Sequence, residues 1–279
     1  KLLQDFLKNN EYSGFNVTIP YKESVIPYLD YIDKTAKEIG SVNTVLKKQG
    51  KLYGYNTDIS GFSKAFELKK VSVKDKIVCV LGSGGTSKTI QYYLRENQAK
   101  KIYVVSRNGE INYQNYKDFV LDSQILINAT PVGSFPKNEK ALVNLSEFKK
   151  LKFVFDCIYN PFRTDLILQA EKLKIPCSNG LTMLLFQAFF SQIIWGKIQN
   201  DEKIFEKALS LINNKKNIVL IGMPSSGKTT IGKEIAKKLN KEFIDSDLEI
   251  EKTVKKSIPE YIKFYGEKSF REIKEKYSS

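Results

Sequence analysis

Apolar residues form short unbroken runs in this chain, and a glycine turn follows one of them. That run, Ile77–Leu81, leads into the turn Gly82-Ser-Gly-Gly85 and then into a helical pattern that ends near Glu96. A second β-like run, Lys101–Val105, comes next, so the segment predicts a β-α-β unit. Apolar runs of this kind are typical of parallel strands that helices cover on both faces. The pattern therefore predicts an α/β fold.

The glycine turn has the residue types of a dinucleotide site. Gly82, Gly84 and Gly85 let backbone N–H groups approach a pyrophosphate, whose charge a helix N-terminus favours. The usual third glycine is Ser87 here, and a Gly-x-Gly spacing alone also fits an ordinary turn. Arg107 follows the second strand and suits a ribose 2′-phosphate, which indicates NADP. The alternative interpretation of Arg107 is a solvated surface residue.

Three polar residues upstream are candidates for a reactive site. Residues 15–19 alternate between apolar and polar, which predicts a half-buried strand, and Lys22 stands just after the Pro20 that stops it. Asn43 lies in a short β-like run, and Asp58 lies at a predicted helix start. Each also has a structural interpretation, because Asp58 could be an N-cap and Asn43 a turn residue.

Composition limits the class of protein. The chain has 279 residues, of which 42% are hydrophobic, so it can form two domains or slightly more with real cores. No apolar run approaches the roughly 20 residues of a membrane span, and we see no secretion signal. The cysteines are far apart at Cys79, Cys157 and Cys177, which indicates buried thiols in a reducing compartment. We therefore expect a cytoplasmic protein with no membrane partner.

The charged residues and the lack of histidine limit the possible partners and reactions of the protein. The 45 Lys and Arg residues against 31 Asp and Glu give a net charge of +14, but the lysines are scattered as pairs without an aromatic stripe. We therefore expect no nucleic-acid partner, and some steering of anionic substrates. The chain has no histidine. Any proton transfer must consequently use Lys, Asp, Glu, Tyr or Cys.

A second nucleotide signal lies near the C-terminal end. Residues 218–221 form an apolar run that predicts a buried strand, and residues 222–229 (GMPSSGKT) match the full G-x-x-x-x-G-K-[ST] loop before a helical pattern. In such a P-loop, Lys228 reaches the β- and γ-phosphates of ATP and Thr229 binds Mg²⁺. The predicted ATP-binding residues are Gly222, Ser225, Ser226, Gly227, Lys228, Thr229 and Thr230.

A series of ordered motifs in the first 196 residues or so resembles shikimate dehydrogenase. They are NVTIPYK (16–22), GSVNTV (40–45), GYNTDISGF (54–62), GSGGTS (82–87), SRN (106–108), INATPVG (127–133), FDCIYNP (155–161) and NGLTM (179–183) with Gln187. The resemblance implies NADP-dependent reduction of 3-dehydroshikimate to shikimate, with Lys22 and Asp58 as the catalytic pair. It implies the substrate-binding residues Thr18, Asn43, Asp58, Tyr159 and Gln187. It implies the cofactor-binding residues Gly82, Ser83, Gly84, Gly85, Thr86, Ser106, Arg107, Thr130, Gly180 and Met183.

The C-terminal part resembles the opening third of shikimate kinase, which phosphorylates shikimate with ATP. The resemblance rests on the P-loop, on FIDSD (243–247) and on GEKSFR (266–271). It implies that Asp245 and Thr229 serve the Mg²⁺ site and that Asp247 and Arg271 bind shikimate. Lys274 departs from that family, which usually has a Glu there. We expect this part to lack phosphoryl transfer, because the later strands and the lid arginine of the family are absent.

Together these features predict a fused chain. Its expected parts are a substrate domain (1–62), a Rossmann-like NADP domain (63–176), helices that return to the substrate domain (177–213) and a partial P-loop α/β domain (214–279). Departures from the dehydrogenase pattern are a missing front strand with its serine pair, a short crossover at 108–125, and Ser134 where Met is common. Two alternatives stay open: a catalytically inactive nucleotide-binding fragment, and a dehydrogenase that prefers quinate.

Overall fold

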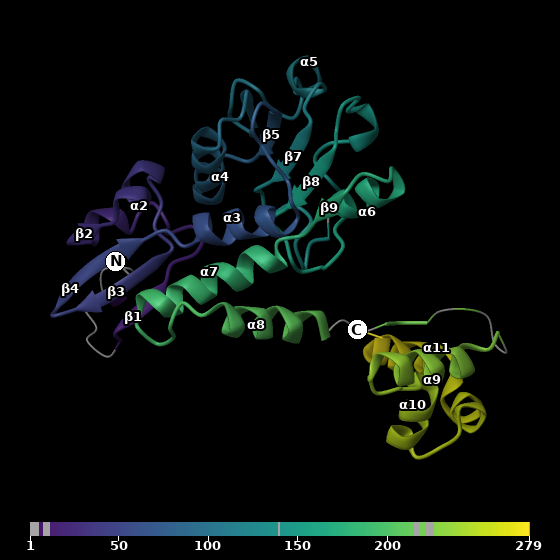
Figure 1. Cartoon of the computed structure of the whole chain (residues 1–279). Coiled ribbons are helices and arrows are strands. Elements are labelled where there is room, and N and C mark those ends of the chain that lie inside the picture. The colour runs from purple at the N-terminus through teal and green to yellow at the C-terminus, as the bar shows by residue number, and fades with distance from the viewer. Residues whose placement is uncertain are drawn as a thin grey trace. The chain divides into compact units, whose positions relative to one another are not determined.

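A computed structural model of the chain describes residues 6–7, 12–138, 140–214, 218–220, 222 and 226–278 (Figure 1). The chain divides into two compact units, Lys1–Asn214 and Lys215–Ser279. The first unit contains two sheets, one near each end of a pair of long helices (Figure 1). The regular elements in the described part of the second unit are helices.

The smaller sheet of the first unit has four strands. They are β1 (Gly14–Asn16), β2 (Tyr31–Ile32), β3 (Thr44–Lys48) and β4 (Lys51–Tyr55), in the order β1-β3-β4-β2. The β1/β3 and β3/β4 pairs are antiparallel, and β2 runs parallel to β4. A 3-10 turn, η1 (Ile26–Tyr28), and the helix α2 (Lys34–Ile39) complete this layer. Its core consists of Leu7, Val17, Val25, Ala36, Val42, Val45 and Leu52.

The larger sheet is fully parallel. Its strands are β5 (Ile77–Leu81), β6 (Lys101–Val105), β7 (Ile125–Asn128), β8 (Phe153–Asp156) and β9 (Cys177–Ser178), in the order β6-β5-β7-β8-β9. The chain moves from β5 to β6 on one side and later to β7 on the other side. This reversal creates a crevice at the carboxyl ends of β5 and β7, which is where open α/β sheets bind their ligands.

Helices cover both faces of the parallel sheet. They are α3 (Asp58–Leu68), α4 (Gly85–Glu96), α5 (Lys117–Val120), α6 (Asp165–Lys172) and α7 (Leu181–Ile194), followed by α8 (Glu202–Asn214), with a 3-10 turn η2 (Leu145–Glu147). Val78 and Val80 pack into one core with α3 and α4, whereas Cys79 and Leu81 pack into another with α6. This alternation follows from the two-residue period of a strand. Among the described residues, no helix is both long enough and apolar enough to cross a membrane.

The helices α3 and α7 link the two sheets (Figure 1). A Cβ at Gly61 of α3 would lie 2.5 Å from the carbonyl oxygen of Met183 in α7, so glycine allows close packing of the helices. Beyond the other end of α7, the indole Nε1 of Trp195 donates to the Val45 carbonyl oxygen at 3.0 Å. The helix α7 therefore reaches from the parallel sheet to the strand β3.

Most predicted elements of the first unit occur where the pattern placed them. The predicted β-α-β unit is β5, α4 and β6. The predicted strand 15–19 is shorter, because β1 ends at Asn16 and Ile19 is largely exposed in the turn that follows. The crossover between β6 and β7 is short, as expected, and its helix α5 has only four residues. These differences lie at element ends, where local sequence determines structure least.

The second unit contains α9 (Lys228–Leu239), α10 (Ser246–Val254) and α11 (Ile258–Ser278), with a break in α11 at Gly266. The predicted buried strand at 218–221 is wrong over its described residues 218–220, which form no strand. Ile218 and Val219 are 52% and 78% exposed. The described part of this unit offers no second strand to pair with that run, and an isolated strand leaves its backbone groups unpaired. Ile221 lies outside the described residues.

Candidate active site and nucleotide sites

The predicted catalytic pair is in direct contact. Lys22 lies in the turn after β1, and its Nζ is 2.6 Å from Oδ2 of Asp58, the first residue of α3. Both side chains are mostly buried, with exposed fractions of 12% and 8%. The N-terminus of α3 is capped by Asn56, whose Oδ1 accepts from the Ile59 N–H at 3.1 Å. The Asp58 carboxylate is therefore not used as a cap and is available to Lys22.

Asn43 holds the second oxygen of the same carboxylate. Its Oδ1 accepts from the backbone N–H of Thr57 at 2.7 Å, which fixes the orientation of the amide because only an oxygen can accept there. Its Nδ2 consequently faces Asp58 Oδ1 at 3.0 Å and Gln187 Oε1 at 3.3 Å. The two carboxylate oxygens of Asp58 are thus fixed separately, one by Lys22 and one by Asn43.

The remaining predicted substrate-binding residues surround this group in different ways. Gln187 comes from α7 and is half-buried beside Asn43. Thr18 and Tyr159 are exposed, and in the described part of the chain their side chains make no hydrogen bond to this group. The structure therefore brings together Lys22, Asn43, Asp58 and Gln187, but not Thr18 or Tyr159.

The cofactor turn follows β5 and is closed by Ser87. Gly82 has a positive φ of 103°, and its carbonyl oxygen accepts from the Ser87 hydroxyl at 2.6 Å. Ser87 is fully buried, so the serine in the third glycine position stabilises the turn from inside. A Cβ placed at Gly84 would meet no atom within 4 Å, and no side chain caps the N-terminus of α4. This open, uncapped helix start fits a pyrophosphate group.

Gly85 has a different neighbour from Gly84. A Cβ at Gly85 would lie 2.7 Å from Ser41 Oγ and 3.4 Å from the Cβ and Cδ atoms of Lys22. The next residue, Thr86, accepts at its Oγ1 from Lys22 Nζ at 3.4 Å. The glycine turn and the catalytic pair are therefore adjacent.

The strand ends beside the turn supply further cofactor candidates. Ser106 and Arg107 directly follow β6, and Arg107 is exposed. Burial raises the pKa of the Tyr113 hydroxyl, and the positive charge of nearby Arg107 acts in the opposite direction. The Tyr113 hydroxyl also donates to the Val105 carbonyl oxygen at 3.4 Å.

Thr130 is held through a buried residue that the sequence interpretation missed. Asn128 Oδ1 accepts from the N–H and the hydroxyl of Thr130, at 3.0 and 2.7 Å. The amide of Asn128 in turn donates to Asp156 Oδ1 at 3.0 Å. Burial raises the pKa of Asp156, while the hydrogen bonds from Thr164, Ile158 and Asn128 act to lower it. An acidic residue at the end of a predicted buried strand was the available signal.

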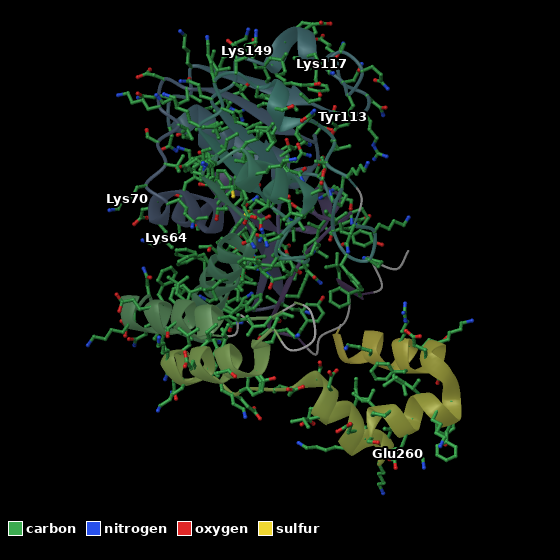
Figure 2. The ribbon with its side chains drawn as sticks, turned by 90° about the vertical axis from the view of Figure 1, so that its right-hand side faces the viewer. Lys64, Lys70, Tyr113, Lys117, Lys149 and Glu260 are labelled. Carbon is green, nitrogen blue, oxygen red and sulfur yellow. The ribbon has the colours of Figure 1, made fainter. Side chains whose placement is uncertain are left out.

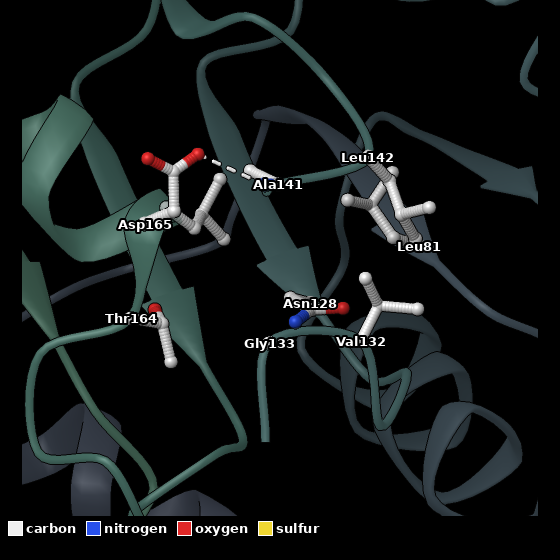
Figure 3. Close-up of a pocket in the computed structure, with 9 residues that line it drawn as sticks. Leu81, Asn128, Val132, Gly133, Ala141, Leu142, Thr164 and Asp165 are labelled. Carbon is white, nitrogen blue, oxygen red and sulfur yellow. Dashed lines mark hydrogen bonds between the residues drawn. The ribbon is translucent and has the colours of Figure 1, made fainter. Parts of the chain in front are cut away.

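A small pocket at the carboxyl ends of β5 and β7 lies beside this group (Figure 3). Asp165 of α6 accepts there from the Ala141 N–H at 2.9 Å, which ties the segment after β7 to α6. The lining residues are Leu81, Asn128, Val132, Gly133, Ala141, Leu142, Thr164, Asp165 and Leu166. The loop that carries Thr130 is therefore anchored at both of its ends.

Gly180 and Met183 lie at the start of α7. A Cβ at Gly180 would collide with the backbone carbonyl of Cys157, so this position requires glycine. Met183 is buried in the core with Phe62 and Phe155. Its side chain consequently offers little surface to a cofactor.

The described residues of the P-loop have a local nucleotide-site geometry. Gly227 has a φ of 79° and precedes α9 as its N-cap, and the Lys228 Nζ donates to the Gly222 carbonyl oxygen at 2.9 Å. Thr229 Oγ1 donates to Asp245 Oδ2 at 3.3 Å. Ser226 and Thr230 flank this segment, and Ser225 lies outside the described residues.

The predicted shikimate-binding residues of the second unit have separate partners. Asp247 pairs with Lys274 at 3.2 Å, and Arg271 pairs with Glu267 at 2.6 Å. The described residues of the chain contain no cluster of three or more His, Cys, Asp or Glu side chains that could hold a metal ion. Thr229 and Asp245 stay the predicted Mg²⁺ residues.

Lysines occupy separate elements of the first unit (Figure 2). Lys64 belongs to α3 and Lys70 follows it, whereas Lys117 belongs to α5 and Lys149 follows η2. Lys64 pairs with Glu67 at 2.7 Å and Lys117 pairs with Glu147 at 2.6 Å. Part of the positive charge is thus neutralised locally.

Comparisons with known proteins support both motif resemblances. Residues 1–45 match the family model of the shikimate dehydrogenase substrate binding domain, and residues 224–278 match that of shikimate kinase. Shikimate dehydrogenase (NADP(+)) of Clostridium perfringens strain 13 is 40% identical over 210 residues, covering 70% of this chain and 78% of the relative. The protein of the same name from Clostridium beijerinckii is 36% identical over 225 residues, covering 77% and 83%.

Solved structures agree with the fold. A chorismate mutase/shikimate 5-dehydrogenase fusion protein from Clostridium acetobutylicum superposes with a TM-score of 0.70 at 36% identity, over 77% of this chain and 82% of that chain. Shikimate 5-dehydrogenase from Thermus thermophilus, in complex with NADP(H) and shikimate, gives 0.63 at 28% identity, over 75% and 83%. These matches confirm the predicted α/β fold. Because the curated relatives share up to 40% identity over more than three quarters of their length, the chain belongs to the shikimate dehydrogenase family.

Proposed function

We propose that the first unit is an NADP-dependent dehydrogenase that interconverts 3-dehydroshikimate and shikimate. The observation that carries this proposal is the buried contact of Lys22 with Asp58, 2.6 Å long, placed against the glycine turn through Thr86. Hydride transfer requires that a secondary alcohol and a dinucleotide bind next to each other. The contact of the Lys22–Asp58 pair with the glycine turn provides neighbouring places for them. The relatives named shikimate dehydrogenase (NADP(+)) support the choice of substrate and cofactor.

The chain supplies proton transfer and orientation. The cofactor, when bound, supplies or accepts the hydride. In the reducing direction Lys22 Nζ gives a proton to the carbonyl oxygen of the substrate, and in the oxidising direction it takes the proton of the hydroxyl group. Asp58 fixes Lys22 in place, and Asn43 prevents rotation of the Asp58 carboxylate. The chain has no histidine, and among its other proton-transfer groups the paired Lys22 lies against Thr86 of the glycine turn.

The substrate and the cofactor are assigned to neighbouring groups. Asn43 and Gln187 would hold the hydroxyl groups of the substrate, with the exposed hydroxyls of Thr18 and Tyr159 as further donors. The open backbone at Gly84 and the uncapped start of α4 fit the pyrophosphate. Arg107 is exposed at the end of β6, where it could pair with a 2′-phosphate. Ser83, Ser106, Thr130 and Gly180 complete the proposed cofactor surface.

Turnover by purified full-length chain tests this proposal. NADPH formation is followed with shikimate and NADP, and in parallel with quinate, for the wild type, Lys22→Ala and the exposed-lysine control Lys70→Ala. We expect turnover with shikimate that Lys22→Ala abolishes and Lys70→Ala retains. Faster turnover of quinate would change the substrate. NADP binding by the wild type without turnover of either alcohol would favour the inactive nucleotide-binding alternative.

For the second unit we propose nucleotide binding without phosphoryl transfer. Lys228 and the Thr229–Asp245 contact support a phosphate and Mg²⁺ site for ATP. Transfer to shikimate also needs a closed site with the acceptor in line, whereas Asp247 and Arg271 are exposed and paired with other residues. An ADP-release assay with ATP, Mg²⁺ and shikimate checks this assignment. ADP release that Lys228→Ala abolishes would show that the unit is an active kinase.

A further inference from the structure

Three buried hydroxyl groups contact one another next to the proposed substrate-binding residue Asn43. They belong to Thr44 at the start of β3, Thr57 before α3 and Ser191 in α7. The Oγ1 atoms of Thr44 and Thr57 are 3.0 Å apart, and Ser191 Oγ is 2.8 Å from the first and 3.1 Å from the second. Thr44 and Ser191 are fully buried and Thr57 is nearly so. The triangle therefore joins α7 to two segments that lie 134 and 147 residues earlier in the sequence.

The surroundings of the triangle define the role of Ser191. Its hydroxyl donates to the carbonyl oxygen of Gln187, one turn earlier in α7, at 2.9 Å. Asn16 Nδ2 of β1 donates to both Ser191 Oγ and Thr44 Oγ1 at 3.0 Å. A serine hydroxyl has one proton, so once that proton points to Gln187 the oxygen of Ser191 can only accept. Ser191 Oγ is consequently the acceptor for Asn16, and its second lone pair can accept from one of the two threonine hydroxyls.

This network continues into the groups that are assigned to the substrate. Thr57 Oγ1 is 3.0 Å from Asn43 Nδ2, and that amide also contacts Asp58 and Gln187. Gln187 lies on the same helix as Ser191, so the hydrogen bonds of Ser191 fix the place from which Gln187 reaches Asn43. The hydrogen-bond partners of Ser191 in the described part of the chain come from β1, β3, α7 and the residue before α3, and not from the cofactor turn.

We propose that Ser191 is a positioning residue for the substrate. It fixes α7 against the four-stranded sheet, so that Gln187 and Asn43 keep the orientation that binds the hydroxyl groups of the substrate. This inference rests on the proposed dehydrogenase function. Removing the hydroxyl takes one buried acceptor away from the Asn16 amide and the threonine hydroxyls, which keep hydrogen bonds to Asn43. Losing such an acceptor typically changes an equilibrium by about ten-fold or more.

Kinetics and binding on full-length chain test the role. Ser191→Ala should raise the KM and the calorimetric Kd for shikimate roughly ten-fold, while the KM for NADP changes less than about two-fold. Ser191→Thr, which keeps the hydroxyl, should recover most of the shikimate affinity. The matched control is Ser123→Ala, because Ser123 is a fully buried serine whose hydroxyl has no hydrogen-bond partner among the described residues.

The sole tryptophan reports whether α7 remains in place. Trp195 follows α7 and contacts Val45, so its fluorescence would shift if α7 separated from β3. Unchanged emission with weaker shikimate binding in Ser191→Ala supports positioning. Wild-type shikimate affinity in Ser191→Ala would overturn the proposal, as would equal losses for shikimate and NADP together with shifted emission. A wild type that binds shikimate without turnover would contradict the dehydrogenase function alone, because the binding comparison would still test Ser191.

Discussion

Substitution by alanine should affect different properties at the adjacent glycines Gly84 and Gly85. Neither has a φ in the left-handed region, so alanine adds a methyl group without backbone strain. At Gly85 that methyl group would lie 2.7 Å from Ser41 Oγ, a distance at which an atom must move. At Gly84 it would meet no atom within 4 Å. Gly85→Ala should therefore destabilise the fold, whereas Gly84→Ala should act on the cofactor.

The size of the effect follows from the packing. Adding a methyl group to a filled buried site typically costs about 1–3 kcal/mol. For a unit of this size each kcal/mol lowers the unfolding midpoint by about 2–4 °C, so Gly85→Ala should lower it by roughly 2–12 °C. Ser41 is fully buried, and its Oγ has no hydrogen-bond partner among the described residues. Ser41→Ala should thus cost little and should make room for the new methyl group.

Thermal unfolding of four variants tests this reasoning. The set is Gly84→Ala, Gly85→Ala, Ser41→Ala and the double variant Ser41→Ala with Gly85→Ala, each with NADP binding measured by titration. We expect the double variant to recover most of the stability lost in Gly85→Ala. Gly84→Ala should keep the wild-type midpoint and bind NADP roughly ten-fold more weakly, since its methyl group would hinder the pyrophosphate. Equal midpoints for the two single glycine variants, or no recovery in the double variant, would refute the argument.

Four further outcomes are expected. Lys22→Ala should lower kcat about 10²–10⁴-fold and leave NADP affinity nearly unchanged, which steady-state kinetics and titration would show. Arg107→Ala should weaken NADP binding about ten-fold or more without affecting NAD, and an equal loss for both cofactors would contradict the 2′-phosphate assignment. Burial raises the pKa of Asp156, so its contribution to stability is present below the ordinary aspartate pKa and is lost as the pH rises through the raised value. Asp156→Asn should therefore gain stability relative to the wild type as the pH rises, in denaturant unfolding measured at several pH values, and a change of opposite sign would contradict this. In the second unit, Lys228→Ala should weaken ATP binding without altering shikimate oxidation, as parallel titrations and turnover assays would show.

The local sequence pattern was sufficient to predict the parallel sheet of the first unit, but it was not sufficient for the second unit. The run Ile77–Leu81 and the glycine turn predict β5 and α4 because each depends on neighbours in sequence and on burial. The apolar run at 218–221 obeys the same pattern, yet residues 218–220 form no strand. A strand exists only when another supplies its ladder, and the described part of that unit contains none.

The motifs identified the predicted catalytic pair, but not the hydrogen bonds that hold the surrounding residues in place. Lys22 and Asp58 were predicted through the family resemblance, and the structure places them in contact, although their roles stay a prediction. The capping by Asn56, the link from Asp156 to Thr130 and the hydroxyl triangle of Ser191 were not predicted. The Asn56 bond is local, whereas the other two depend on hydrogen bonds between distant segments, for which a single sequence has no periodic signal.

The helix α7 is fixed at two places, by its close crossing with α3 and by the contact of Trp195 with β3. Its length therefore sets the distance between these two contacts. From Met183 to Ser191 the helix rises about 12 Å, and each residue turns it by about 100°. Inserting one residue between Gln187 and Ser191 would rotate the serine out of the hydroxyl triangle and shift everything beyond it along the axis. Length changes should therefore be tolerated in the crossover between β6 and β7, which is already irregular, and excluded from α7. The number of residues in α7 therefore sets the distance between the parallel sheet and the strand β3.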